Sequence, residues 1–403
     1  MTLPWQDAHV DGLARQLQSV RDVGAGNSVV EVDFGAGMTA LGKGTRVLDL
    51  RPRKRGIVPA DGPVRWEALD ALPQLLTVEW AGPDRGIVEA VAARPNIKFL
   101  YWFDAEGDID LSSTRVGTVR LDGLNMRSIR LPRSIESLSL GRAPAHFDVQ
   151  PPRPTVSRTL RVDAPDGGHR LDLRMFHYDA DVVIPEGVRR ASSLWLWLSG
   201  QVSASVLLGL CDMETLRLSF DRPPGAITDL AGLRTLTALC RLQLDEAYGL
   251  TVEELPDLPA LRALELNGTR RVTAHAVKAR YRGSAVSVNV SGAKTDQWLS
   301  LHMDNPFRDW VHDSKAFGRA ACAAYDRARR SADAIGADDP QRLALAEEVL
   351  RGLVADLNAI ENKYHLIDTH NRETAGDAFH DLAHRLGVAS VDAHRWFDGG
   401  RNF

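Results

Sequence analysis

Cysteine and long apolar runs are scarce in this chain of 403 residues, and each scarcity excludes a class of protein. The three cysteines, Cys211, Cys240 and Cys322, are far apart and form no Cys-x-x-Cys pair, which argues against a disulfide framework or a cysteine zinc site. No apolar stretch approaches the roughly 20 residues that span a bilayer. The N-terminus lacks a basic segment followed by an apolar one, so no signal peptide is expected. These features predict a cytoplasmic protein.

Neither sign of charge dominates, because 49 Lys and Arg face 53 Asp and Glu for a net charge of -4. A dedicated nucleic-acid binder carries a basic stripe or a strongly basic domain instead. The chain also lacks the Gly-Lys-Ser/Thr of a Walker loop and the Gly-x-Ser-x-Gly nucleophile elbow. The sequence therefore predicts a globular protein with no cofactor, no nucleic-acid partner and no membrane partner, and it favours a non-enzymatic role.

A Leu-x-Leu pair recurs through the middle of the chain at steps of 22, 26, 22 and 22 residues. Its copies are Leu194/Leu196, Leu216/Leu218, Leu242/Leu244, Leu264/Leu266 and Val286/Val288. Because side chains alternate across a strand, each pair predicts a short strand with both residues on one face. One such strand cannot bury that face alone, so neighbouring strands must stack. Residues 170–290 are therefore predicted to form a solenoid of short parallel strands.

One copy of the repeat resembles the leucine-rich-repeat family. From Leu261 to Thr269 the sequence follows the pattern LxxLxLxx(N/C/T), with Thr269 in the place of the buried ladder residue. Ser199, Asp221 and Ala247 stand at that place in other copies, so the ladder is interrupted and the solenoid should be irregular. The resemblance implies an α/β solenoid that binds a partner rather than one that catalyses a reaction.

Weaker candidate strands lie upstream of Leu194, at steps of 11 to 28 residues. Their apolar pairs are Leu48/Leu50, Leu76/Val78, Phe99/Tyr101, Val119/Leu121, Leu138/Leu140, Leu160/Val162 and Leu171/Leu173. Some steps are too short to hold a helix, so parts of residues 109–175 are predicted to run as strand and turn only. Residues 7–22 are expected to form a helical cap. Residues 1–295 are thus assigned to the solenoid, with a separate domain over 1–150 as the alternative.

The composition changes after Ser291, and residues 296–403 are predicted to form a mainly helical module. The three expected helices cover about 315–334, 340–363 and 371–386. Asp339 and Pro340 suit the N-cap and first position of the second helix, and Gly387 suits the end of the third. A module of this size can build its own core.

The end of this module resembles uncharacterised bacterial proteins. The similarity lies in the run from Ile367 to Glu373 (Ile-Asp-Thr-His-Asn-Arg-Glu) and in the late aromatic segment from Arg395 to Phe403. These match a pattern of the form (I/E)-(D/E)-T-x-x-R-E followed by W-R-(D/E)-(W/F). Some proteins with this pattern are thought to be encoded near polymorphic-toxin immunity genes. The resemblance implies an immunity-like role and no agreed activity.

The residues between the paired leucines are the candidate binding residues, because they should point away from the core. Aligning the repeats gives one column of Trp195, Arg217, Gln243 and Glu265 and a second of Trp197, Ser219, Asp245 and Asn267. Trp and Arg are enriched at interface hot spots, and large exposed apolar groups without a task are a liability. The alternative is that the two tryptophans are covered core residues.

A His-x-x-x-His pair, His380 and His384, offers a second candidate site. Residues four apart on a helix share a face and could hold a metal with a third ligand such as His370. Asp381 stands where a zinc protease needs glutamate. Solvated histidines are the simpler interpretation.

Two functional hypotheses follow. The first is a protein-binding scaffold that uses the concave strand face of the solenoid, with an immunity-like role as its specific form. The second is a metal-dependent hydrolase or nuclease with its site in the C-terminal module around His380 and His384.

Overall fold

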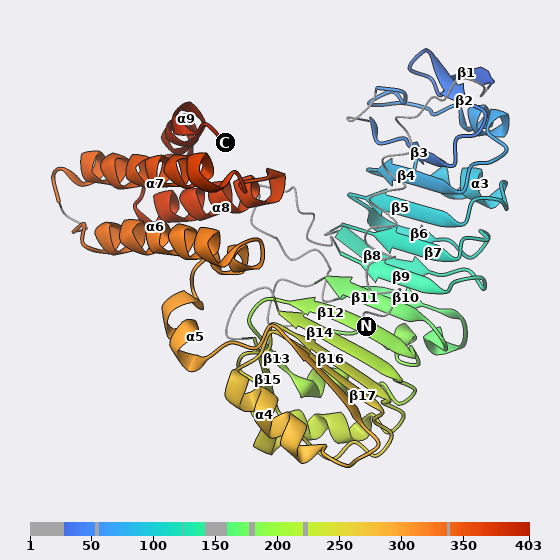
Figure 1. Ribbon diagram of the computed structural model, residues 1–403. Helices are drawn as coiled ribbons and strands as arrows, with labels where there is room; N and C mark the ends of the chain where they lie inside the picture. Colours follow the sequence, from blue (N-terminus) through green and yellow to red (C-terminus); the bar gives the residue numbers. More distant parts are fainter. Residues whose placement is uncertain are drawn as a thin grey trace. The chain divides into compact units, whose positions relative to one another are not determined.

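The computed structural model describes residues 28–52, 56–123, 125–141, 159–176, 182–220, 225–336 and 339–403. These residues form two compact units, shown in Figure 1. The solenoid unit contains the described residues up to Gly292 apart from 270–272, and the helical unit contains 270–272 and the described residues from Ala293 onwards. The helical cap expected at residues 7–22 lies outside the described residues.

A parallel sheet of 11 strands runs through the described part of the solenoid unit (Figure 1). In spatial order its strands are β3 (Val47–Asp49), β4 (Thr77–Ala81), β5 (Phe99–Phe103), β7 (Thr118–Leu121), β9 (Ser137–Leu140), β11 (Asp172–Phe176), β12 (Ser193–Leu198), β14 (Thr215–Phe220), β16 (Arg241–Asp245), β17 (Ala263–Asn267) and β18 (Ser287–Ser291). The chain adds these strands one after another in sequence order. This arrangement confirms the predicted α/β solenoid with a leucine-rich-repeat-like parallel strand stack.

The paired leucines are buried because the strands align them. Leu194 is in register with Leu216, and the same row continues through Leu242 and Leu264. Each of these side chains is at most 1% exposed. Since burying one leucine contributes about 1.5–3 kcal/mol, the row of leucines supplies the main force that stacks the repeats.

The inward-facing pair differs from the prediction in several strands, most clearly in β5. Phe99/Tyr101 was the expected inward pair, but Leu100 and Trp102 are buried at 0% and 1% exposure, while Phe99 is 36% exposed. Every residue of this strand is apolar or aromatic, so alternation of polarity could not fix its register. A shift of one residue exchanges the two faces of a strand. In other strands the expected pair lies on the correct face but two residues before the observed pair. In β18 the expected pair is Val286/Val288, and the residues aligned with Leu264 and Leu266 are Val288 and Val290.

The returns between strands are mostly 3-10 turns and short strands rather than α-helices. The 3-10 segments are η2 (Trp66–Ala71), η3 (Pro165–Gly168), η4 (Glu186–Val188), η5 (Ala204–Leu207), η6 (Leu230–Thr235) and η7 (Val252–Glu254), and the α-helices are α3 (Ile87–Ala92) and α4 (Arg271–Arg280). The connections between the main-sheet strands also contain two smaller parallel sheets. They contain β6 (Glu106–Asp110), β8 (Asn125–Arg130) and β10 (Arg161–Asp163), and β13 (Gln201–Ser203) and β15 (Ala226–Thr228). The expected strand at Leu160/Val162 is β10, which therefore lies outside the main sheet.

An antiparallel hairpin of β1 (Val29–Asp33) and β2 (Met38–Gly42) precedes the main sheet. Asp33 Oδ1 accepts hydrogen bonds from the backbone N–H groups of Gly35 and Gly37, at 2.7 and 3.1 Å. Gly37 has a φ of 117°, a value that only glycine adopts without strain. The glycines of this segment therefore serve the turn.

The helical unit contains α5 (Asp296–His302), η8 (Arg308–His312), α6 (Lys315–Asp333), α7 (Arg342–Tyr364), α8 (Thr369–Arg385) and α9 (Ser390–Gly400). Aromatic side chains such as Phe307, Phe317 and Phe379 are fully buried in its separate core. The second helix begins two residues later than expected, because Asp339 accepts from Gln341 N in a turn before α7. None of the described helices has both the length and the apolar content that crossing a membrane requires.

Candidate partner-binding surface

Side chains that alternate with the buried leucines form a continuous row across the sheet. Adjacent strands lie about 4.8 Å apart, and strand pairing aligns one such side chain from each. From β3 to β18 this central row contains Asp49, Glu79, Tyr101, Arg120, Ser139, Arg174, Trp195, Arg217, Gln243, Glu265 and Asn289. Two residues further along β11 to β18, an outer row contains Phe176, Trp197, Ser219, Asp245, Asn267 and Ser291. The two rows together are called the strand face.

The eight residues singled out in the sequence all lie on the strand face. Trp195, Arg217, Gln243 and Glu265 are neighbours in the central row, and Trp197, Ser219, Asp245 and Asn267 are neighbours in the outer row. All are partly exposed except Ser219, which is buried. The leucines that alternate with the two tryptophans are at most 1% exposed. Both indole rings are therefore outside the hydrophobic core.

Trp195 is the centre of a cluster of aromatic and arginine side chains. The Arg217 guanidinium carbon lies 4.2 Å from the centre of its ring, and that of Arg174 lies 6.0 Å away. Phe176 packs edge-on at 5.6 Å between ring centres, and Trp197 is tilted at 6.0 Å. These five residues are called the Trp195 cluster. Sequence reasoning missed Arg174 and Phe176, because its two columns began at Trp195 and Trp197. The expected pair Leu171/Leu173 also lies two residues before the inward residues of β11, Leu173 and Met175.

Asp245 links the residues on the C-terminal side of this cluster. Its Oδ2 accepts from Arg217 Nε and Ser219 Oγ, both at 2.6 Å, and its Oδ1 accepts from Gln243 Nε2 at 3.0 Å and Asn267 Nδ2 at 2.8 Å. Burial acts to raise the pKa of Asp245, but the Arg217 charge and the three other donors outweigh it and lower that pKa. The carboxylate is therefore ionised at neutral pH and holds four neighbours in place.

Ser219 connects Asp245 to the tryptophan. Its hydroxyl donates to Asp245 Oδ2 and accepts from Trp195 Nε1 at 2.9 Å. Trp197 differs, since its Nε1 is buried and has no hydrogen-bond acceptor in the part of the chain that the structure describes. An unpaired buried donor costs about 1–3 kcal/mol. On the strand face, the indole N–H of Trp195 is therefore held by a hydrogen bond, and that of Trp197 lacks an acceptor among the described residues.

A second, more polar cluster occupies the N-terminal end of the strand face. Arg51 Nη2 lies 2.7 Å from Asp49 Oδ2 and 3.0 Å from Glu79 Oε2. The guanidinium groups of Arg51 and Arg120 lie 4.8 and 5.6 Å from the centre of the Phe103 ring. Sequence reasoning missed this cluster, because its columns did not extend upstream of Trp195 and because the expected register of β5 turned Phe103 inward.

The candidate metal-binding histidines lie in the helical unit. His380, His384 and His394 line a pocket of about 330 Å³, where the His380 and His394 rings are 4.3 Å apart. Burial, followed by the nearby His394, lowers the pKa of His380. His370 precedes His380 by ten residues on α8, about 15 Å along the axis, so it does not join them. No group of three or more residues suited to hold a metal occurs among the described residues.

Comparison with known proteins leaves the chain without an assigned family. No known family profile matches it, and no curated protein matches its sequence. Among solved structures it is similar to an internalin of Listeria monocytogenes, with 12% identity and a TM-score of 0.30 over 64% of this chain and 85% of the other. It is also similar to a leucine-rich-repeat protein of Leptospira interrogans, with 12% identity and a TM-score of 0.26 over 70% and 76%. The fold assignment therefore stands on the strand register itself.

Proposed function

We propose that this protein is a binding scaffold that docks another protein on the strand face, centred on the Trp195 cluster. The observation that supports this most is the pairing of a partly exposed tryptophan with Arg217 on a rigid parallel sheet. Tryptophan and arginine are the residue types that carry most binding energy in protein interfaces. Binding by such a surface requires shape and chemical complementarity and no bond chemistry.

The hydrogen-bond network around Asp245 favours this function because it fixes the surface before a partner arrives. Ordering a side chain on binding costs about 0.5–1.5 kcal/mol, and Arg217, Ser219, Gln243 and Asn267 are already held by Asp245.

Affinity capture from an extract of the source cells tests the proposal. The bait is the full chain, compared with Trp195→Ala, Arg217→Glu and a control, Arg234→Ala, on the exposed return side. A protein retained by the wild type and the control but lost by both strand-face variants supports the scaffold. Retention by all four baits, with folding verified by circular dichroism, would show that binding does not use the strand face.

The identity of the captured protein also decides the more specific hypothesis that the C-terminal sequence pattern suggests. An immunity-like role requires the bound protein to be a toxin whose activity falls when the complex forms. Mixing the purified pair and measuring that activity, with Trp195→Ala as the control, distinguishes masking of a toxin from binding without inhibition.

A further inference from the structure

The C-terminal edge of the main sheet is open. β18 is its last strand, and among the described residues it pairs only with β17. Ser287 N donates to Arg262 O at 2.8 Å, so the odd-numbered residues of β18 turn their backbone groups towards β17. Backbone groups of successive residues in a strand point to opposite sides. The N–H and C=O groups of Val288 and Val290 therefore face outwards from the sheet edge.

The hydrophobic core is also incomplete at this edge. Leu264 and Leu266 of β17 are 0% exposed, whereas Val288 and Val290, which continue the same rows, are only partly buried. Val286 is likewise partly buried against the core. None of the five residues of β18 is charged or is proline, although exposed edge strands usually carry such residues to discourage pairing with another chain. The edge is thus a template for an added strand with apolar side chains at alternate positions.

The helix α4 turns a basic flank in the same direction. Its other flank faces the preceding return, because Arg280 Nη1 donates to Val252 O at 3.1 Å and Arg280 Nη2 lies 2.8 Å from Asp257 Oδ1. Lys278 and Arg282 each lie two residues from Arg280, about 200° around the helix axis. Both side chains are exposed. They therefore face away from the preceding repeat, towards the open end of the stack.

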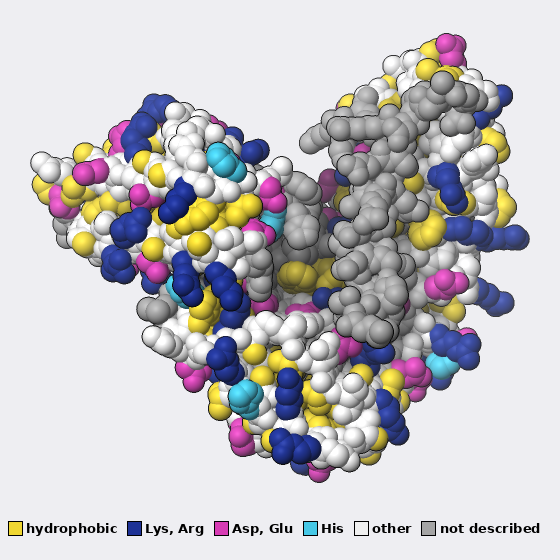
Figure 2. All heavy atoms as spheres, in the orientation of Figure 1, with side chains coloured by type: hydrophobic (Ala, Val, Ile, Leu, Met, Phe, Trp, Pro, Cys, Tyr) yellow, Lys and Arg dark blue, Asp and Glu magenta, His cyan; other side chains and the backbone are white. Residues whose placement is uncertain are grey.

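No acidic residue of this part of the chain offsets the basic flank. The stretch from Leu266 to Thr295 contains six Lys or Arg and no Asp or Glu, in a chain whose net charge is -4. Of these six, Arg280 is paired with an acid, whereas Lys278 and Arg282 form no ion pair with any residue that the structure describes. Figure 2 shows Lys and Arg side chains on the surface of α4. A segment that lies along the edge is therefore attracted if it is acidic near the amino end of β18, five residues after Arg282.

We propose that an extended acidic segment of another protein adds a strand to β18. Its backbone hydrogen-bonds to Val288 and Val290, its alternate apolar side chains extend the buried rows, and its carboxylates face Lys278 and Arg282. Strand addition to an open sheet edge is a general mode of peptide recognition, in which main-chain bonds give affinity and side chains give specificity. A nucleic acid matches the charge but offers no apolar side chains to the exposed valines. The site is the sheet edge, so the inference does not rest on the function proposed for the strand face.

Fluorescence anisotropy of labelled peptides, titrated with the full chain up to about 100 µM, tests the proposal. The probes alternate valine and threonine and carry glutamates at either the amino or the carboxyl end, and each has a counterpart with lysines instead. A glutamate peptide should bind at least tenfold more tightly than its lysine counterpart. The better position of the glutamates gives the direction of the added strand. Absence of binding by the wild type, or no preference for glutamate, overturns the proposal.

Two sets of variants separate the backbone contribution from the charge. Val290→Pro removes an N–H that faces outwards, so it leaves the bonds to β17 in place. It should weaken binding at least tenfold, whereas Val290→Thr, which keeps the N–H, should not. The double variant Lys278→Glu, Arg282→Glu should reverse the preference from glutamate to lysine. Arg234→Glu, at an exposed position of another return, should leave that preference unchanged, with folding of all variants verified by circular dichroism.

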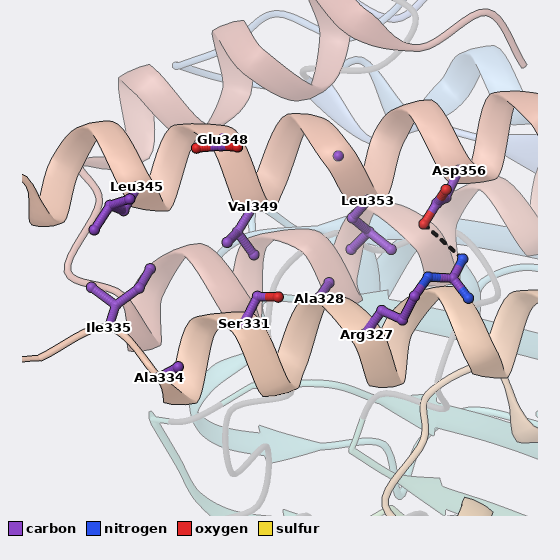
Figure 3. Close-up of a pocket in the computed structure, with 11 residues that line it drawn as sticks. Arg327, Ala328, Ser331, Ala334, Ile335, Leu345, Glu348, Val349, Leu353 and Asp356 are labelled. Atoms are coloured by element: carbon purple, nitrogen blue, oxygen red, sulfur yellow. Dashed lines mark hydrogen bonds and ion pairs between the residues drawn. The ribbon is translucent and has the colours of Figure 1, made fainter.

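Competing sites give distinguishable results. The groove between α6 and α7 in the helical unit, about 570 Å³ in volume, also has partly exposed apolar side chains, Leu345 and Val349 among them (Figure 3). Gly352→Leu adds a side chain there, where a Cβ meets nothing within 4 Å, and should not change peptide binding. Loss of binding in this variant, or binding that Val290→Pro leaves intact, contradicts the added strand. A single-stranded oligonucleotide that binds more tightly than the glutamate peptide and ignores Val290→Pro would assign the basic flank to nucleic acid instead.

Discussion

The guanidinium of Arg217 lies 4.2 Å from the centre of the Trp195 ring, and both side chains are anchored through Asp245. Arg217 Nε donates to that carboxylate directly, and Trp195 Nε1 reaches it through the Ser219 hydroxyl. The two residue types favoured at binding hot spots are therefore held in a fixed geometry on adjacent strands. A partner that stacks on them would lose little free energy in ordering them.

The two tryptophans of β12 should respond differently to replacement by phenylalanine. Trp195→Phe removes the hydrogen bond to Ser219 and weakens the contact with Arg217, which should lower the free energy of unfolding by about 1–2 kcal/mol. Trp197→Phe removes a buried donor that lacks an acceptor in the described chain. It should therefore lower the free energy of unfolding by about 1 kcal/mol less than Trp195→Phe does. Urea unfolding of both variants measures this difference. Equal destabilisation would contradict the assigned environments.

Replacing Asp245 with asparagine should destabilise the solenoid unit by about 1–3 kcal/mol at pH 7, because an amide cannot accept all four hydrogen bonds. The pKa of Asp245 is lower in the folded chain than in the unfolded chain. Its contribution is therefore present above the unfolded value of about 3.9 and is lost as the pH falls through the folded value. The difference from the wild type should shrink on acidification. Asp61→Asn, at an exposed position, is the control, and a difference independent of pH would refute the ionic role.

Replacing Asp377 with asparagine should stabilise α8 above pH 6. Burial, followed by the charges of Asp381 and Glu373, raises the pKa of Asp377 to about 6. The folded chain thus retains a proton that the unfolded chain releases near pH 3.9, and this stabilisation, present below 3.9, is lost as the pH rises through 6. The Asp377 side chain is still exposed to solvent, which screens the repulsion, so relief of the two like-charge pairs at i,i+4 spacing should contribute only about 0.2–0.5 kcal/mol.

Amide hydrogen exchange of α8 at pH 5 and pH 8 measures the effect of Asp377→Asn. Protection should increase at pH 8, and the increase should be smaller at pH 5. Asp304→Asn, an exposed position in the same unit, should change neither value. An increase of equal size at both pH values would mean that the carboxyl does not titrate between them.

The register of β5 predicts that alanine substitutions at the adjacent positions 99 and 100 differ in their effect on stability. Leu100→Ala leaves a cavity under a central strand and should cost about 2–5 kcal/mol, because the side chain is fully buried. Phe99→Ala should cost less than about 1.5 kcal/mol, since Phe99 is 36% exposed on the other face. The midpoints of urea unfolding compare the two. A reversed order would restore the register expected from the sequence.

The repeat was recognisable from the sequence where only one apolar pair in a strand could face inward. In β12 to β17 leucines alternate with polar residues or tryptophan and return at even steps, so the inward face and the neighbouring strands followed directly. In β5 both faces are apolar or aromatic, and in β11 two apolar pairs compete for one position. Local alternation then carries no information about which face is buried.

The helices α6, α7 and α8 followed from the spacing of apolar residues, but α9 did not. Helical spacing identifies a buried stripe; it does not reveal which neighbouring helix covers that stripe or what remains open. Arg327 and Asp356 are ordinary charged residues in the sequence. Their ion pair exists only because α6 and α7 pack side by side.

The sequence by itself determined the parallel strand stack, the row of buried leucines and the two columns that start at Trp195 and Trp197, because these follow from side-chain alternation and a regular return. Only the tertiary structure decided that Asp245 receives four donors, that Arg174 and Phe176 join the tryptophans, and which residues of β5 turn inward. The physical reason is that these contacts join different repeats. Their energies depend on distances across strands, and those distances are set when all the repeats pack together.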